Sequence, residues 1–70
     1  MFGSQMRYIE QHNGVAYTRH TIDGLAKEYR GRVFKPKAVV IELTDREAQT
    51  AYQEYAAQTY PDIPFEIHLL

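Results

Sequence analysis

The fold is decided by residues 37–70, which have the sequence KAVVIELTDREAQTAYQEYAAQTYPDIPFEIHLL. The middle of this stretch, from Thr44 to Tyr60, has the features of one amphipathic helix. It begins with a capping box, in which the Thr44 hydroxyl accepts a hydrogen bond from the Glu47 amide. Pro61 disfavours helical geometry at the residue before it, so the helix should end at Tyr60.

The helix has one apolar face, and a strand flanks it on each side. The face consists of Ala48, Ala51, Tyr52, Tyr55, Ala56 and Thr59. Residues 37–43 are apolar on both parities in their middle, which is typical of a central strand covered on both faces. Residues 65–70 alternate, with Phe65, Ile67 and Leu69 facing inward. A strand, a helix and a strand of these lengths predict a right-handed crossover between two parallel strands.

Residues 7–20 have the pattern of a β-hairpin. Asn13-Gly14 is a preferred two-residue turn, because both of its central positions need positive φ. The flanking segments 7–12 and 15–20 are rich in β-branched and aromatic residues. Neither face of this hairpin is cleanly apolar, so we expect a half-exposed ribbon at the edge of the sheet.

Residues 21–31 change to a helical period. Their apolar positions are Ile22, Leu25, Ala26 and Tyr29, which form one stripe of a helix. Thr21 stands at the N-cap and Gly31 at the position of a left-handed C-cap residue. Asp23-Gly24 is also a hairpin turn, so a β-meander that continues through Phe34 is the alternative.

These segments predict one α+β domain over residues 1–70, with residues 1–5 as a tail. The expected architecture is a small two-layer domain of order β-β-α-β-α-β. Its mixed sheet would combine the N-terminal hairpin, turning at Asn13-Gly14, with the C-terminal right-handed βαβ crossover. Chains of this size usually need a disulfide, a metal or a second copy to be stable. Because the chain has no cysteine, we expect a homo-oligomer, in the simplest case a homodimer.

The composition argues against membrane insertion and against a strong electrostatic preference. The net charge is −1, whereas nucleic-acid-binding domains are usually basic overall. The first residues have neither the charged start nor the apolar stretch of a signal peptide, and no apolar run approaches a membrane span. Together with the lack of cysteine, these features indicate a cytoplasmic protein.

The most conspicuous charged feature is a basic segment at residues 27–37. Its bases are Lys27, Arg30, Arg32, Lys35 and Lys37, with Phe34 among them. Three interpretations are open. The charges can act as gatekeepers that keep the following strand from pairing promiscuously. They can contact an acidic protein surface, or they can bind nucleic acid with Phe34 stacked on a base.

No pattern of catalytic or metal-binding residues is present. Ser4, the only serine, lies in the expected tail, and there is no glycine-rich phosphate loop. His12, His20 and His68 are scattered and lack the spacing of a zinc site. We therefore predict that the protein is not an enzyme and holds no cofactor or metal.

Six tyrosines in a chain without tryptophan suggest a contact surface, because tyrosine buries a large ring and keeps a polar tip. In the predicted hairpin Tyr8 faces Arg19, a pairing suited to an interface. The expected function is a small non-enzymatic binding or regulatory protein that acts through protein contact. By size, it resembles the inhibitors of larger host machines that phages and other mobile elements encode. The candidate binding residues are Tyr8, Tyr17, Arg19, Arg30, Arg32, Phe34, Lys35 and Lys37. The alternative is a nucleic-acid-binding or nucleotide-sequestering module that uses residues 27–37.

Overall fold

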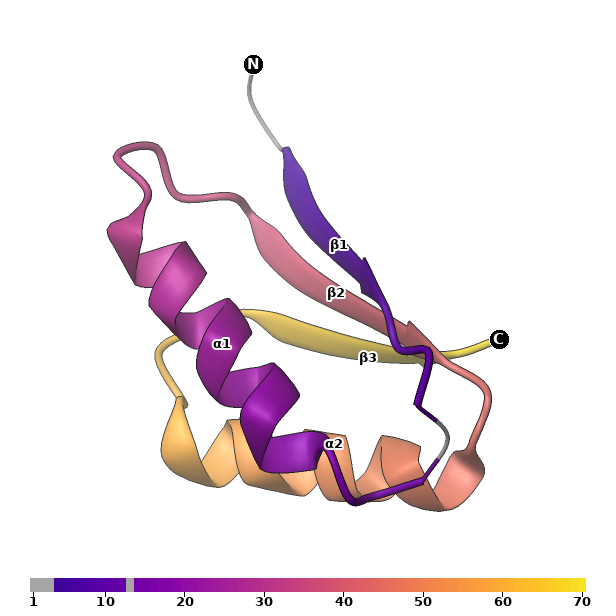
Figure 1. Ribbon diagram of the computed structural model, residues 1–70. Helices are drawn as coiled ribbons and strands as arrows, with labels where there is room; N and C mark the ends of the chain where they lie inside the picture. The colour runs from indigo at the N-terminus through magenta and orange to yellow at the C-terminus, as the bar shows by residue number, and fades with distance from the viewer. Residues whose placement is uncertain (1–3, 13) are drawn as a thin grey trace.

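Strands and helices alternate strictly along the chain in the computed structural model, which describes residues 4–12 and 14–70 (Figure 1). The elements are β1 (Gln5–Ile9), α1 (Thr18–Gly31), β2 (Ala38–Leu43), α2 (Arg46–Thr59) and β3 (Phe65–Leu69). Gln5 belongs to β1, and the Ser4 carbonyl accepts a bond of 2.8 Å from the Lys37 amide. The tail predicted for residues 1–5 is therefore wrong at these two positions, and residues 1–3 lie outside the described part.

The three described strands form one parallel sheet with β2 at its centre. Helix α2 joins β2 to β3, so the predicted strand–helix–strand unit with parallel strands is confirmed. The sheet is not mixed, and the order is β-α-β-α-β instead of β-β-α-β-α-β. The general class, a small α+β domain of two layers, is as predicted.

The predicted N-terminal hairpin is wrong. Its first half forms β1, which pairs with β2, while residues 18–20 are the first turn of α1. Asn13 lies outside the described residues, and Gly14 has a φ of 106°, so the glycine of the turn signal serves the β1–α1 connection instead. The physical reason lies in β2, whose backbone groups need hydrogen-bonding partners on both edges, and β1 supplies them on the edge away from β3. A parallel neighbour requires a helical crossover, and α1 supplies it.

Helix α1 confirms the helical interpretation of residues 21–31 and excludes the β-meander, since Asp23 and Gly24 lie inside the helix. Its ends differ from the prediction. The helix begins at Thr18 with Tyr17 at the N-cap, and Thr21 is buried in its first turns. Gly31 is the last helical residue and has no positive φ.

Helix α2 ends as predicted, with Tyr60 as C-cap residue before Pro61, but it begins one residue later than the capping box suggested. Asp45 is the N-cap residue. Its Oδ1 accepts bonds from the amides of Glu47, at 2.9 Å, and Ala48, at 3.4 Å. A carboxylate in this position satisfies two orphan amides and also interacts favourably with the helix dipole.

The Asp45 cap leads to a first prediction. Asp45→Ala is expected to lower the free energy of unfolding by about 1 kcal/mol, because two amides at the start of α2 lose their acceptor. Asp45→Asn keeps an oxygen acceptor and should cost less than half as much. Urea unfolding followed by circular dichroism at neutral pH measures both variants. Equal losses for the two variants would contradict the capping role.

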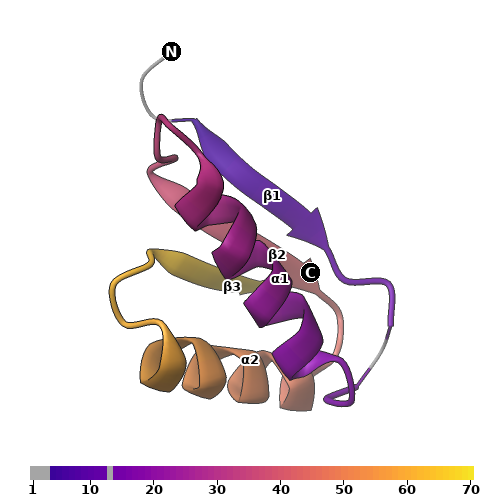
Figure 2. The same cartoon turned by 60° about the vertical axis from the view of Figure 1, so that its left-hand side comes forward.

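Both helices pack on the same face of the sheet (Figure 2). The core residues of the strands lie on one face of the sheet and are Met6, Val39, Ile41, Leu43 and Ile67. They pack with Ile22 and Ala26 of α1 and with Ala48, Tyr52 and Ala56 of α2. The chain moves in one direction across the sheet with both helices on one face. The two crossovers therefore share one hand, which we expect to be the right hand.

Among the described residues, no helix covers the other face of the sheet. Val40 at its centre is nevertheless only 1% exposed, since Arg7 and Glu66 on the neighbouring strands flank it. The Arg7 Nε lies 3.9 Å from the Glu42 carboxylate on the same face. The prediction that β2 is buried on both faces is thus confirmed, although long side chains and not a second layer cover one of them.

Candidate functional site

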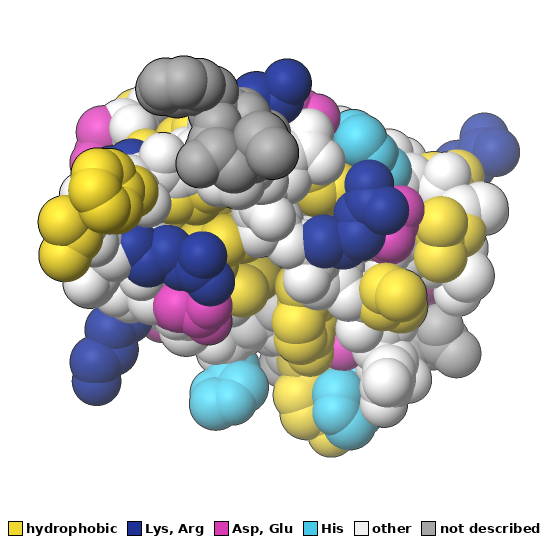
Figure 3. Space-filling view, turned by 90° about the horizontal axis from the view of Figure 1, so that it is seen from above, with side chains coloured by type: hydrophobic (Ala, Val, Ile, Leu, Met, Phe, Trp, Pro, Cys, Tyr) yellow, Lys and Arg dark blue, Asp and Glu magenta, His cyan; other side chains and the backbone are white. Residues whose placement is uncertain are grey.

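The most exposed large hydrophobic side chains lie at the tip of the loop between α1 and β2. Val33 and Phe34, which we call the tip, are 88% and 89% exposed. In Figure 3 hydrophobic atoms protrude beside Lys and Arg side chains on the side where Figure 1 places this loop. Two adjacent apolar side chains held in water add almost nothing to folding stability. Exposed apolar side chains that lie together are candidates for contact with another molecule.

Three of the five bases in residues 27–37 brace this loop against the domain. The Arg30 Nη2 lies 3.2 Å from both carboxylate oxygens of Asp62. The Arg32 Nη2 lies 2.8 Å from the Glu28 Oε2 one helical turn away. The Lys35 ammonium donates to the Arg30 carbonyl, at 3.3 Å, and also to the Arg32 carbonyl. These bases therefore shape the loop as well as charge it.

The remaining bases, Lys27 and Lys37, are exposed and form no ion pair within residues 4–12 and 14–70. They supply the positive charge that the segment can offer to a partner without rearrangement. The gatekeeper interpretation does not apply to the folded protein, because β2 is already paired with a strand on both edges. What remains is a braced basic loop with an apolar tip.

The predicted hairpin surface does not exist, because its three residues lie in different environments. Tyr8 is half-buried in β1 and packs against the core. Tyr17 stacks on His12, with ring centroids 4.1 Å apart. The Arg19 guanidinium lies 5.8 Å from the centroid of the Tyr55 ring. The predicted pairing of Tyr8 with Arg19 is therefore wrong.

A polar seam joins α1 to the end of α2. The Asp23 carboxylate accepts hydrogen bonds from the hydroxyls of Tyr60, at 2.7 Å, and Tyr55, at 2.8 Å. These two bonds hold the pKa of Asp23 below its usual value and raise the pKa of both tyrosines. The Arg30 guanidinium also lies over the Tyr60 ring, 5.1 Å from its centroid. Two of the six tyrosines thus hold the helices together.

A buried carboxylate lies directly after β1, at a position that the predicted hairpin left half-exposed. Glu10 is 7% exposed. Its Oε1 accepts a bond of 3.0 Å from the His12 amide, and its Oε2 accepts bonds from the hydroxyls of Tyr52 and, at 2.9 Å, Thr21. No buried side-chain nitrogen or oxygen among the described residues lacks a partner. The network links the β1–α1 connection to both helices.

The electrostatics of this network favour an ionised Glu10. Burial by itself raises the pKa of Glu10. The hydrogen bonds from Tyr52, His12 and Thr21 outweigh burial and hold the pKa below its usual value. Burial, followed by the bond to Glu10, raises the pKa of Tyr52. Both oxygens of Glu10 are engaged, so the carboxylate acts as an anchor of the fold.

The signal that could have found this network is the hydroxyl of Tyr52. A tyrosine on the apolar stripe of a helix needs a partner for its O–H group when it is buried. In the predicted fold Glu10 lies on a half-exposed hairpin and Tyr52 lies on the apolar face of a helix. The prediction therefore contained no contact between the two side chains. Within the described residues, no three His, Asp or Glu side chains gather in a way that could hold a metal ion.

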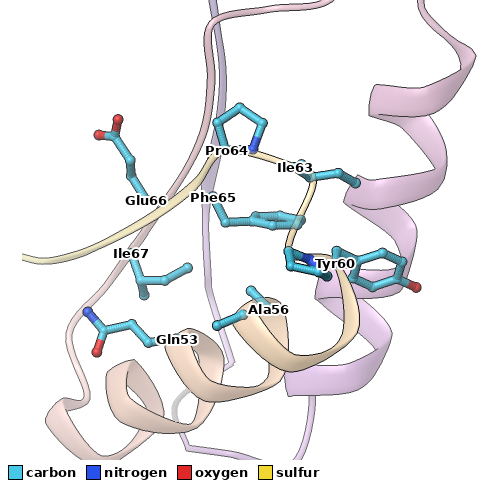
Figure 4. Close-up of a pocket in the computed structure, with 10 residues that line it drawn as sticks. Gln53, Ala56, Tyr60, Ile63, Pro64, Phe65, Glu66 and Ile67 are labelled. Carbon is cyan, nitrogen blue, oxygen red and sulfur yellow. The ribbon is translucent and has the colours of Figure 1, made fainter.

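A groove of about 420 Å³ runs between the C-terminal half of α2 and β3 (Figure 4). Its apolar lining includes Ala56, Ala57, Tyr60, Ile63, Phe65 and Ile67. Gln53 and Glu66 add polar groups. The groove is lined by none of the candidate binding residues that were predicted from the sequence.

Comparisons with protein-family models, with curated proteins and with solved structures found no match to this chain. Neither of the two described helices has the length and apolar content needed to cross a membrane.

Proposed function

We propose that this chain is a non-enzymatic binding protein of the cytoplasm, whose braced basic loop inserts Val33 and Phe34 into an apolar pocket rimmed by acidic residues on a partner protein. The observation that carries the proposal is the exposure of the tip, 88% and 89% for its two side chains. Apolar anchors surrounded by polar and basic groups are the usual anatomy of a binding hot spot.

The bracing of the loop supports this function. Arg30, Arg32 and Lys35 are engaged with the domain, and Pro36 is buried directly after the tip. A loop that is already ordered loses less conformational entropy on binding, so more of the contact energy appears as affinity. Lys27 and Lys37 would steer the loop toward acidic surfaces. A regulator or inhibitor of a larger host machine, as phages encode, would act through such a contact.

Replacement of the anchor tests the proposal. Phe34→Ala is expected to weaken partner binding about 30-fold, the loss typical of a hot-spot residue. The stability should stay nearly unchanged, because the ring contacts little of its own domain. The partner is captured on the wild-type protein and purified, and its dissociation constant is measured by calorimetry with each variant.

Val15→Ser is the matched control, because Val15 is also an exposed apolar residue, 52% exposed, but lies outside the loop. It should bind the partner as the wild-type protein does. The proposal fails if Phe34→Ala captures the same protein with the same dissociation constant. It also fails if Val15→Ser weakens binding equally.

Nucleic-acid binding through the same loop is the second candidate. It is favoured by the exposed Phe34 ring and by Lys27 and Lys37 of the same basic segment, which form no ion pair with the described residues. Base stacking on the ring and phosphate contacts by Lys27 and Lys37 would be its physical basis. Because Arg32 and Lys35 brace the loop, Lys27→Glu/Lys37→Glu is a cleaner test than substitutions at those positions. That variant should abolish binding to single-stranded nucleic acid, and wild-type binding should fall steeply with salt. Weak salt dependence with a protein partner distinguishes the first function.

A further inference from the structure

The outer edge of β3 is open for strand pairing within the described structure. The Val39 amide donates to the Pro64 carbonyl at 2.9 Å, and the Leu70 amide donates to the Leu43 carbonyl at 2.7 Å. With Val39 opposite Phe65 and Leu43 opposite Leu69, the even-numbered residues of β3 hydrogen-bond to β2. The amide and carbonyl groups of residues 65, 67 and 69 therefore point away from the sheet.

Two of these outward groups already have partners: the Phe65 amide donates to the Ile63 carbonyl at 2.8 Å, in the turn before β3. The Gln49 Nε2 of α2 donates to the Ile67 carbonyl at 3.1 Å. A side-chain amide here occupies the place that the backbone N–H of a neighbouring strand would take. The edge thus has the hydrogen-bonding geometry of a strand that accepts another strand.

We propose that two copies of this chain pair through β3, antiparallel and about a two-fold axis that passes beside Ile67. This register pairs all five residues of the strand. The Gln49 side chain then moves aside, and Ile67 exchanges both backbone hydrogen bonds with Ile67 of the partner subunit. Phe65 and Leu69 each pair with the opposite residue of the second copy, and the Phe65 amide gives up its bond to the Ile63 carbonyl for the new partner. The two three-stranded sheets become one sheet of six strands, and the open edge is removed.

Charge complementarity supports this register. Glu66 and His68 lie on the face of the sheet without helices, and the His68 Nε2 is 3.2 Å from the Glu66 Oε1. In the antiparallel pair Glu66 lies directly opposite His68 of the partner subunit, and the symmetric contact forms as well. An imidazole N–H can donate to the opposed carboxylate, and the two groups form an ion pair when the imidazole is protonated. The sequence Phe-Glu-Ile-His-Leu is therefore complementary to itself.

The groove beside α2 supports the same arrangement. Phe65, Ile67 and Leu69 share the helix side of β3, and Leu69 is 36% exposed. The pairing places Leu69 of the partner subunit opposite Phe65, which lines the groove between α2 and β3. An exposed leucine on each copy thus meets an apolar groove on the other. The α2 flank at this edge carries the polar side chains of Gln49 and Gln53.

The edge formed by β1 does not have this complementarity. Pairing of its five residues, Gln5–Ile9, about a two-fold axis would centre on Arg7. Arg7 would then lie directly opposite Arg7 of the partner subunit, and like charges at opposed positions destabilise a strand pair. An outward charge of this kind protects an edge from self-association. The structure therefore selects β3 and not β1 for the contact.

A charge reversal tests the register. His68→Glu places two carboxylates opposite each other at both symmetric positions, and it should raise the dimer dissociation constant about tenfold or more. Glu66→Lys alone should also weaken the dimer. The double variant Glu66→Lys/His68→Glu places a lysine opposite a glutamate at both symmetric positions. The opposed residues are then complementary again, so the dimer dissociation constant should return to the wild-type value. Sedimentation equilibrium over protein concentrations up to about 1 mM measures each constant.

The side chains of Glu66 and His68 are about half exposed, so the charge variants at these positions are expected to fold. Circular dichroism verifies the folding of each variant. Leu69→Asp is an independent variant, since it puts a charge into the groove of the second copy and should also yield monomers. A wild-type protein that stays monomeric at every concentration overturns the proposal, whether or not another extended chain binds the groove. The proposal is also overturned if the single charge variants leave the dimer dissociation constant unchanged, or if the double variant does not restore it.

This dimer does not depend on the proposed function of the loop, and the two can fail separately. Phe34→Ala should leave the dimer dissociation constant unchanged, because β3 and the tip lie in different parts of the chain. The monomeric variant Leu69→Asp should still bind the partner protein, with the affinity of a single loop. A dimer would present two loops, and a partner with two pockets would bind it more tightly through avidity.

Discussion

Tyr52→Ala is expected to remove a large part of the folding stability, because Tyr52 is the largest fully buried side chain of a small domain. Tyr52 is 0% exposed and packs between both helices and the sheet. Truncation of a buried aromatic residue to alanine costs about 3–5 kcal/mol. A domain of this length has a total stability of roughly 4–10 kcal/mol. The variant also leaves the buried Glu10 without its hydroxyl partner.

Two comparison variants separate the packing of Tyr52 from its hydrogen bond. Tyr52→Phe keeps the ring and removes only the hydroxyl group, so it should cost about 1–3 kcal/mol. Tyr55→Ala, on the same helix but half-buried, should cost less than Tyr52→Ala. Urea unfolding at 25 °C, followed by far-ultraviolet circular dichroism, measures all three variants. A urea midpoint for Tyr52→Ala equal to that of the wild-type protein would contradict the described core.

Glu10→Gln is expected to lower the stability at neutral pH by about 1–3 kcal/mol and to remove part of its dependence on acid pH. The folded-state pKa of Glu10 lies below its ordinary value of 4.5. Its ionised form therefore stabilises the fold fully above about pH 4.5, where the unfolded chain titrates. That contribution is lost as the pH falls through the lower folded-state pKa.

The measurement is the urea midpoint between about pH 7 and pH 3 for the wild-type protein and Glu10→Gln. The two curves should lie apart at neutral pH and converge toward the acid end. Asp23→Asn provides the matched control. Asp23 also has a lowered pKa, but it is exposed on the seam between the helices, so its effect should be smaller. Curves for the wild-type protein and Glu10→Gln that stay parallel down to pH 3 would exclude the proposed role of Glu10.

The C-terminal half could be predicted because its signals are local. The apolar run of β2, the apolar stripe of α2 and the proline after Tyr60 each act within a few residues of the structure they determine. The N-terminal half contains equally strong local signals that compete. Asn13-Gly14 favours a hairpin, but residues 18–20 form the first turn of α1, whose buried side chains pack on the sheet.

The candidate sites show the same division. The basic segment around Phe34 was visible in the sequence, since charges and an aromatic residue close together need no fold to be noticed. The bracing of Arg30 by Asp62 was not, because these residues are far apart in the chain and meet only when α1 and the α2–β3 connection pack together. The predicted contact between Tyr8 and Arg19 failed because it depended on the hairpin.

Local signals predicted the two helices, the buried central strand and the parallel crossover through α2, because periodicity and caps act over short distances. The pairing of β1 with β2 and the contact of Glu10 with Tyr52 became visible in the folded structure alone. The same holds for the edge of β3, whose backbone groups point away from the sheet. These outcomes depend on contacts between residues distant in the chain. The domain forms such contacts to bury both sides of β2 and to give each buried polar group a partner.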